Sequence, residues 1–396
     1  MNRSELPQEI VDDIIDYHRN DKPVLGTCSL VCRTWSFRAR HHLFADVVIT
    51  KLKSDTTVTL GPIVTRCFRN VHLYVGLSTE TLSDFLEPLI GVHFENAVSL
   101  VIHAFEAAER TPLTSQDSEI LHHLTPCIVN LRVSHLPFET TDHFTKFICG
   151  FQHLETLAAV NRLFQPTILS KSATGFQLSF PDNLRAVDVS DDCASLARWL
   201  LSFHHLPPIH TIDGVISTTF GLDVSTSCLL RKLGASLETV RLVCLGMLLS
   251  SPKSTSIHIT RKGHTRYQLI NLCHHIRLRS LHLDIRCVND DTVGGIASVL
   301  SRIVSMHMES VSFTFLRQRY QEHDLFDDFD WAKMDEALAQ PIFANLKRVE
   351  ITILLNAGSP PSDMERVNSI VDRLPGCHSK GILLTKGQVR TSASSV

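Results

Sequence analysis

A short apolar pattern recurs ten times along this chain, and this repetition restricts the possible folds more than any other feature of the sequence. Each copy has an apolar residue, two variable residues, an apolar residue, one variable residue and a third apolar residue. The copies are FRNVHL at 68, AVSLVI at 97, IVNLRV at 128, LETLAA at 154, LRAVDV at 184, IHTIDG at 209, LETVRL at 237, LRSLHL at 278, MESVSF at 308 and LKRVEI at 346. Their first positions lie 29, 31, 26, 30, 25, 28, 41, 30 and 38 residues apart. A period of this length is typical of solenoids, in which every unit supplies one short strand to a common sheet.

The alternation inside the motif predicts which side of each strand faces the core. Successive side chains of a strand point to opposite faces, so the fourth and sixth positions are predicted to point inward and the fifth outward. Of the twenty inward positions, only Gly214 is not apolar. The outward positions are His72, Val101, Arg132, Ala158, Asp188, Asp213, Arg241, His282, Ser312 and Glu350. Seven of these ten are ionisable in a chain of which 20% is charged, and this separation is what a half-buried sheet requires.

The repeated L-x-x-L-x-L pattern resembles leucine-rich repeats. This resemblance implies an α/β fold: a solenoid with a parallel sheet, in which each strand returns through a helix or an irregular turn. The asparagine or cysteine that regular repeats carry after the motif is mostly missing, so we expect irregular units. Asp330 is predicted to cap a helix that begins near Trp331. Trp331 and Asp335, followed by FANLKRVEITI, resemble the closing unit of fungal F-box-like proteins with divergent leucine-rich repeats.

The first 45 residues show helical rather than strand periodicity. Ile10, Ile14 and Tyr17 recur at helical spacing, and Pro23 suits the start of a second helix. A third helix is predicted around RTWSFRARHHLF, with Trp35 among its apolar positions. Three helices of this length bury little core by themselves, so such a module typically needs a partner or a neighbouring domain.

Cys28 and Cys32 lie within the segment CSLVCRTW and admit three interpretations. A zinc site would need a second ligand pair, and the adjacent His41 and His42 do not easily share one tetrahedral site. A redox pair has two residues between its cysteines, whereas three separate these. On a helix, a spacing of four places both thiols on one face, where cysteine behaves as a small apolar residue. We therefore expect both cysteines to be buried in the core.

Residues 5–44 resemble the F-box. The resemblance rests on L-P-x-E-I at 6–10, Ile14 a turn later, CSLVCRTW at 28–35 and A-x-x-x-L-F at 39–44. It implies docking onto the Skp adaptor of a cullin-RING ubiquitin ligase. The apolar contacts carried over are Leu6, Pro7, Ile10, Ile14, Leu30 and Val31, with Trp35 shared between contact and core. The alternative for each of these residues is ordinary helix packing.

Composition gives no reason to expect nucleic acid or membrane as a partner. The net charge is −3 and the pI is about 6.7. The sequence contains no run of about 18 apolar residues that would span a membrane, and early charges interrupt a secretory signal. Eleven scattered cysteines suit free thiols in a reducing compartment. The expected location is therefore the cytoplasm, the nucleus or both.

The sequence contains none of the motifs that common catalytic sites require. It lacks the phosphate-binding loop, the dinucleotide glycine pattern, the nucleophile elbow and the zinc-protease motif. Histidine pairs occur at 41, 122, 204 and 274, but adjacent histidines point apart on a helix or strand and rarely bind one metal together. We therefore predict no enzyme activity, no cofactor and no metal site.

The function expected from these patterns is that of a substrate-recognition subunit of an SCF-type ubiquitin ligase. The predicted domains are an F-box at 1–46, a solenoid at 47–386 and a disordered polar tail at 387–396. A protein substrate of unknown identity is expected to contact His72, Arg132, Asp188, Arg241, His282 and Glu350. Two alternatives remain open at this point. One is an F-box and leucine-rich-repeat scaffold that acts outside a ligase, and the other is a hydrolase or metal-binding protein that uses the histidines.

Overall fold

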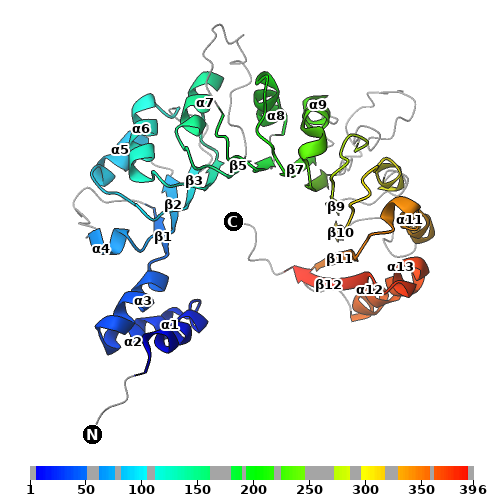
Figure 1. The fold of residues 1–396 in the computed structure, drawn as a ribbon, viewed down its shortest axis with the longest axis horizontal. Coiled ribbons are helices and arrows are strands. Elements are labelled where there is room, and N and C mark those ends of the chain that lie inside the picture. Colours follow the sequence, from blue (N-terminus) through cyan, green and yellow to red (C-terminus); the bar gives the residue numbers. More distant parts are fainter. Residues whose placement is uncertain are drawn as a thin grey trace, which may run out of the picture. The chain divides into compact units, whose positions relative to one another are not determined.

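The computed structural model describes most of the chain in eleven segments. They are residues 6–50, 62–75, 82–104, 112–160, 180–189, 193–217, 224–245, 272–285, 296–316, 329–356 and 361–390. The chain divides into two compact units, residues 1–184 and residues 185–396. Each unit is an α/β structure built around parallel strands (Figure 1).

The first unit begins with three helices and continues with a parallel sheet. The helices are α1 (Gln8–Tyr17), α2 (Lys22–Val31), α3 (Arg33–Leu43), α4 (Pro62–Thr65), α5 (Leu82–Leu86), α6 (Ser115–Leu124) and α7 (Thr141–Cys149). The strands are β1 (Asp46–Ile49), β2 (Asn70–Val75), β3 (Ser99–Ala104), β4 (Asn130–Ser134) and β5 (Thr156–Val160). Each strand pairs in parallel with the next strand along the chain. Helices α4 to α7 lie on one face of this sheet (Figure 1).

The second unit also combines helices with a parallel sheet. Its helices are α8 (Cys193–Ser202), α9 (Val224–Leu233), α11 (Trp331–Leu338), α12 (Pro361–Arg373) and α13 (Pro375–Ser379). Its strands are β6 (Ala186–Val189), β7 (Thr211–Ser217), β8 (Thr239–Leu245), β9 (Ser280–Ile285), β10 (Ser310–Leu316), β11 (Arg348–Asn356) and β12 (Leu383–Arg390). The strands again pair in parallel and in chain order.

All ten strands predicted from the repeated motif are present, as β2 to β11. Each begins at the third position of its motif. The fourth and sixth positions are buried wherever the structure describes their side chains, and the fifth positions are half-buried or exposed, except Ala158. The hydrophobic periodicity therefore predicted both the strands and their inward faces.

One backbone feature joins neighbouring repeats within each unit at the start of their strands. The carbonyl oxygen of Val98 accepts hydrogen bonds from the backbone nitrogens of Val129 and Asn130, both at 2.9 Å. The same double contact recurs in the second unit, where the Glu238 carbonyl oxygen accepts from Arg279 and Ser280. This repetition fixes the parallel register of neighbouring strands because it satisfies the peptide groups that precede each ladder.

The sequence analysis missed the first and last strands. The predicted start of the disordered tail, at residue 387, was also wrong. β1 was not among the ten predicted strands, although FADVVI at 44–49 has the apolar spacing of the motif. β12 includes residues 387–390, which were expected to be disordered, because its backbone pairs with β11 along its whole length. At Gly387 a Cβ would lie 2.5 Å from Sδ of Met364, a flexible side chain of α12. Residues 391–396 lie outside the described residues.

None of the helices in the described part of the chain has both the length and the hydropathy that a membrane span requires.

Candidate functional site: an exposed apolar module and two sheet faces

Helices α1 to α3 form a small module with its own core. Val11 and Ile15 of α1 are buried together with Leu25, Cys28 and Ala39. Val24, Trp35 and Leu43 are partly buried and pack against this core. Trp35 therefore lies partly in the core and partly at the surface.

The two cysteines of this module occupy different environments, contrary to the sequence interpretation. Cys28 is buried, as predicted, but Cys32 is exposed. The helix does not continue through Cys32, which has an extended backbone (φ −161°, ψ 174°) and separates α2 from α3. A spacing of four places two side chains on one face only within one uninterrupted helix, so the prediction for Cys32 was wrong.

A carboxylate holds α1 against α3. Asp16 of α1 accepts hydrogen bonds from the guanidinium of Arg38, with Nε at 2.6 Å from Oδ1, and from Nε2 of His42 at 2.7 Å. The hydrogen bond from Arg38 is the main reason that the pKa of Asp16 lies far below its ordinary value. Asp16 is thus ionised at neutral pH and fixes the angle between the two helices.

The module exposes large apolar side chains on α1 and at the end of α2. The exposed fractions are 59% for Leu6, 45% for Ile10, 39% for Ile14, 84% for Leu30 and 58% for Val31. Pro7 is exposed as well. Since Val11 and Ile15 supply the buried side of α1, this helix is apolar on a second side that faces solvent. Large exposed apolar side chains that gather on one element mark interaction sites.

Two further exposed aromatic residues belong to this module and were not predicted as contacts. Tyr17 is 85% exposed and Phe37 is 74% exposed. Tyr17 continues the spacing of Ile10 and Ile14 along α1, so the helical periodicity already contained a signal for it. Phe37 lies one turn before a cluster of basic residues on α3, and no sequence pattern distinguished it from core.

In the second unit, the predicted contact residues lie in one row across the outward face of the sheet. Asp188, Arg241, His282 and Glu350 share this row with Asp213 and Ser312, in register on β6 to β11. Arg241 forms an ion pair with Asp213 at 3.5 Å, and Nδ1 of His282 lies 2.5 Å from the Ser312 hydroxyl. Glu350 accepts from Lys386 of β12 at 2.7 Å and from Arg348 at 2.6 Å.

These contacts and their partial burial change the ionisation of the row. Desolvation raises the pKa of Asp213, and the nearby Asp188 and Asp284 add to this increase against the opposing effect of Arg241. Desolvation also lowers the pKa of His282, which favours its neutral form. The hydrogen bond from Lys386 lowers the pKa of Glu350. The row is therefore a set of largely satisfied polar pairs.

In the first unit, the structure does not bring the two predicted contact residues together. His72 and Arg132 lie on β2 and β4 in the same register row, and Val101 of β3 separates them. His72 is half-buried and Arg132 is exposed.

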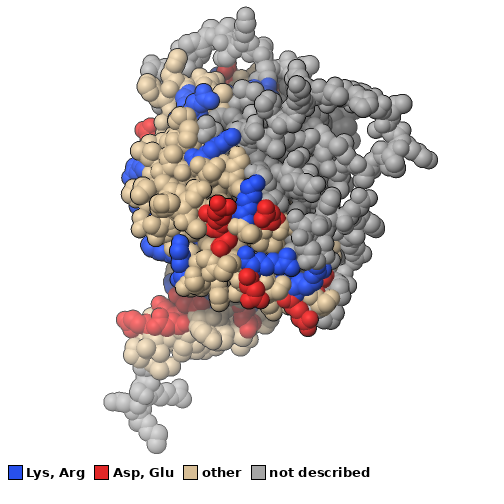
Figure 2. All heavy atoms as spheres, turned by 90° about the vertical axis from the view of Figure 1, so that its right-hand side faces the viewer, with Lys and Arg blue, Asp and Glu red and all other residues tan. Residues whose placement is uncertain are grey.

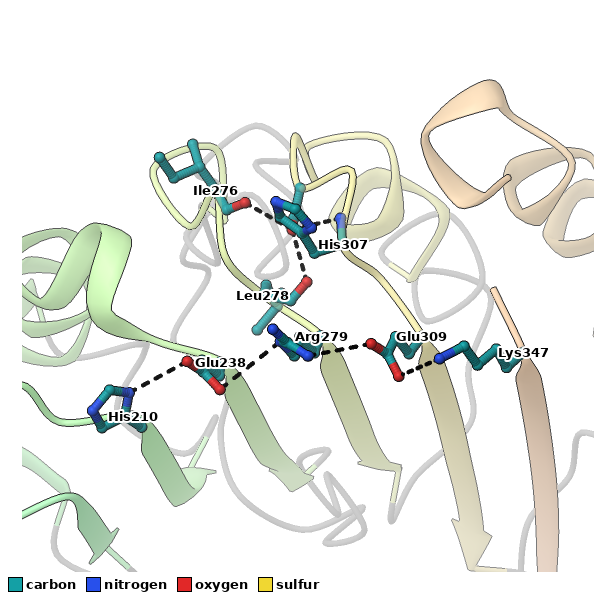
Figure 3. A network of polar contacts seen from close by, with 9 residues as sticks. His210, Glu238, Ile276, Leu278, Arg279, His307, Glu309 and Lys347 are labelled. Carbon is teal, nitrogen blue, oxygen red and sulfur yellow. Dashed lines mark hydrogen bonds and ion pairs between the residues drawn. The ribbon is translucent and has the colours of Figure 1, made fainter. Parts of the chain in front are cut away.

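A row of charges at the start of the strands in the second unit was missed by the sequence interpretation. His210, Glu238, Arg279, Glu309 and Lys347 each occupy the second position of a repeat motif, and the charges alternate in sign from Glu238 to Lys347 (Figure 3). The successive distances are 3.6, 3.9, 3.4 and 2.9 Å. The sequence did contain a signal for this row, because charges of alternating sign recur at the second position of successive motifs. Figure 2 likewise shows basic and acidic side chains next to one another on the face it displays.

The described ranges contain no group of three or more His, Cys, Asp and Glu side chains placed to hold a metal ion.

Comparison with known proteins finds only weak structural similarity. No family model and no curated protein sequence matches the chain. Among solved structures, the chain is similar to the leucine-rich repeat-containing protein LegL7 from Legionella pneumophila, with 12% identity and a TM-score of 0.36. The match covers 84% of this chain and 98% of that one.

Proposed function

We propose that this protein is the substrate-recruiting subunit of an SCF-type ubiquitin ligase, in the cytoplasm or nucleus. The α1–α3 module docks onto the Skp adaptor, which joins it to the cullin, and the strand repeats bind a protein substrate. The protein itself performs no bond chemistry. Its contribution is proximity, because holding a substrate and a charged conjugating enzyme on one scaffold raises their effective concentration to the order of millimolar.

The exposure of the α1 apolar residues is the observation that carries this proposal. Leu6, just before α1, and Ile10 and Ile14 of α1 contact solvent, although this helix has a buried side of its own. Fully burying one such side chain contributes about 1.5–3 kcal/mol. A partner that covers these residues together with Leu30 and Val31 therefore gains binding free energy without reorganising the core of the module. The resemblance of residues 5–44 to the F-box names that partner as the Skp adaptor.

The substrate is proposed to bind the outward faces of the sheets. His72, Arg132, Asp188, Arg241, His282 and Glu350 are the proposed contacts. Their side chains lie on regular strands, so a substrate meets a surface whose geometry is fixed by the backbone ladder. The mixture of charge signs in the second unit favours a protein partner over nucleic acid, which requires a surface of one sign.

A triple substitution at the start of α1 tests the adaptor contact. Replacing Leu6, Pro7 and Ile10 by alanine is expected to abolish capture of purified Skp adaptor, because three exposed apolar contacts are lost together. The control is Ile90→Ala, which removes an equally exposed apolar side chain, 60% exposed, from the same unit outside the module. Both variants are expected to keep the wild-type circular dichroism spectrum. Retention of adaptor binding by the triple variant would contradict the proposal.

A second measurement separates a ligase subunit from a scaffold that uses the adaptor alone. If the protein acts in a ligase, cullin co-purifies with the wild-type chain and is lost with the triple variant. Capture of adaptor without cullin would favour the scaffold.

A further inference from the structure

The outward face of β2 to β4 in the first unit carries an unusual set of side chains. The outward positions are Asn70, His72, Tyr74, Ser99, Val101, His103, Asn130 and Arg132. None of these described positions carries a carboxylate, and most carry hydrogen-bond donors. Asp46 of β1 accepts a hydrogen bond from Nδ2 of Asn70 at 2.6 Å, and Glu155 directly precedes β5 on the other side. Asp46 is three strand spacings, about 14 Å, from the Arg132 strand.

Three rings form a continuous row at the carboxyl ends of these strands. The ring centroids of Tyr74 and His103 are 5.5 Å apart, and those of His103 and His135 are also 5.5 Å apart. All three side chains are half-buried. His135 directly follows β4 and has φ +56°, a left-handed conformation that non-glycine residues rarely adopt. The surrounding structure thus maintains a costly backbone geometry at the residue that completes the ring row.

The second unit provides a contrast on the equivalent face. There the charges of the outward row are already paired, Asp213 with Arg241 and Glu350 with Lys386. An incoming charged group would have to displace these partners. Arg132, by comparison, is exposed and makes no ion pair with any carboxylate in the described ranges of its unit. The charge available for a new partner on the first unit's face is therefore positive.

We propose that the outward face of β2 to β4 binds an acidic segment of a partner protein, rich in Asp or Glu. Arg132 donates paired hydrogen bonds to a carboxylate, a geometry that the planar guanidinium favours. The imidazole of His72 supplies a further donor, and the ring row supports the aliphatic parts of the segment. This inference rests on the proposed role of the sheet faces in partner binding and does not depend on the adaptor contact.

A peptide-binding measurement tests this inference on the full-length chain. The probe is a fluorescein-labelled synthetic peptide of alternating glutamate and serine, and its counterpart is a lysine and serine peptide of the same length. Fluorescence anisotropy at neutral pH and low salt is expected to show at least about tenfold tighter binding of the acidic peptide. Binding is expected to weaken as salt rises toward about 0.5 M, because exposed charges are screened.

Charge reversal at one residue locates the site. Arg132→Glu is expected to weaken acidic-peptide binding by about tenfold or more. Arg19→Glu is the matched control, since it makes the same change in net charge at an exposed position of the same unit and is expected to bind like wild type. A milder variant, Arg132→Gln, keeps the test usable if the reversed charge impairs folding, which circular dichroism would reveal.

Several results would overturn the inference. One is equal binding of the acidic and basic peptides, and another is no detectable binding of the acidic peptide. Unchanged affinity in both Arg132 variants would place the site elsewhere. Tighter binding of single-stranded DNA of equal charge, in competition with the peptide, would assign the face to nucleic acid. Adaptor capture by the α1 module is measured separately, so failure of either proposal leaves the other testable.

Discussion

Gly150 shows at the scale of one residue how closely consecutive repeats pack in the first unit. A Cβ at this position would lie 2.1 Å from Cε1 and 2.2 Å from Nε2 of His122. The His122 ring is held in place because its Nε2 lies 2.9 Å from the Phe147 carbonyl oxygen and its centroid lies 4.6 Å from that of Phe151. Only glycine fits here, although its backbone conformation is ordinary.

Substitution of this glycine is expected to destabilise the protein through steric overlap. Gly150→Ala should lower the free energy of unfolding by about 1–3 kcal/mol, since a rigid ring and its partners must move. Gly26→Ala is the control, because it lies within α2 with no atom within 4 Å of the new Cβ. That variant is expected to raise stability by up to about 1 kcal/mol through helix propensity. Urea unfolding of both variants checks the prediction, and equal effects would contradict it.

At the scale of elements, the last helices of the chain depend on a contact between distant segments. Asp335 of α11 accepts hydrogen bonds from the backbone nitrogens of Gly376 at 2.9 Å and Cys377 at 3.2 Å, at the start of α13. α13 has only five residues and could not form alone. Burial, with Asp335 adding to it, raises the pKa of the Cys377 thiol to about 12. Asp335 therefore acts as a cap supplied by another helix.

Removal of this carboxylate is expected to loosen the end of the second unit. Asp335→Ala should reduce the free energy of unfolding by about 1–2 kcal/mol, the usual contribution of a helix cap. Glu336→Ala removes a neighbouring, exposed acid that makes no such contact in the described residues, and is expected to be nearly neutral. Hydrogen exchange of the α13 amides should quicken in the first variant only. If the α13 amides of Asp335→Ala exchanged as slowly as in the wild type, α13 would be held by packing alone.

At the scale of the whole molecule, both units contain histidines whose burial opposes protonation. Desolvation lowers the pKa of His122 in the first unit and of His275 and His282 in the second, below the ordinary value of 6.5. His275 is fully buried, and its Nδ1 lies 2.8 Å from the Gly234 carbonyl oxygen. Because these groups bind protons more readily when unfolded, acid favours the unfolded chain.

Stability is therefore expected to fall as the pH decreases below about 6.5. The contribution of each histidine is fully present above its unfolded pKa and is lost as the pH falls through its lower folded pKa. Urea midpoints measured from pH 7.5 to pH 5 should decline, and His282→Asn should reduce the slope. A flat profile over this range would contradict the prediction.

The sequence alone determined the repeat architecture, because the fold of a strand repeat depends on local alternation. Val71 and Leu73 are buried on either side of outward His72 because successive side chains of a strand alternate between its two faces. Asp330 was predicted as a cap and its carboxylate accepts from the Lys333 nitrogen at 3.0 Å. Likewise, the helical spacing of the first 45 residues appears as α1 to α3.

Tertiary structure alone decided which apolar residues face solvent and which charges meet. Periodicity does not distinguish the exposed Ile10 and Ile14 from the buried Val11 and Ile15, because α1 is apolar on both sides. Packing against α2 and α3 decides which side is buried. The break at Cys32 likewise depends on how α2 and α3 pack. The row from His210 to Lys347 joins residues 28 to 41 positions apart, whose contact depends on strand register. Local patterns specify elements, whereas the free energy of packing distant elements together specifies the surfaces.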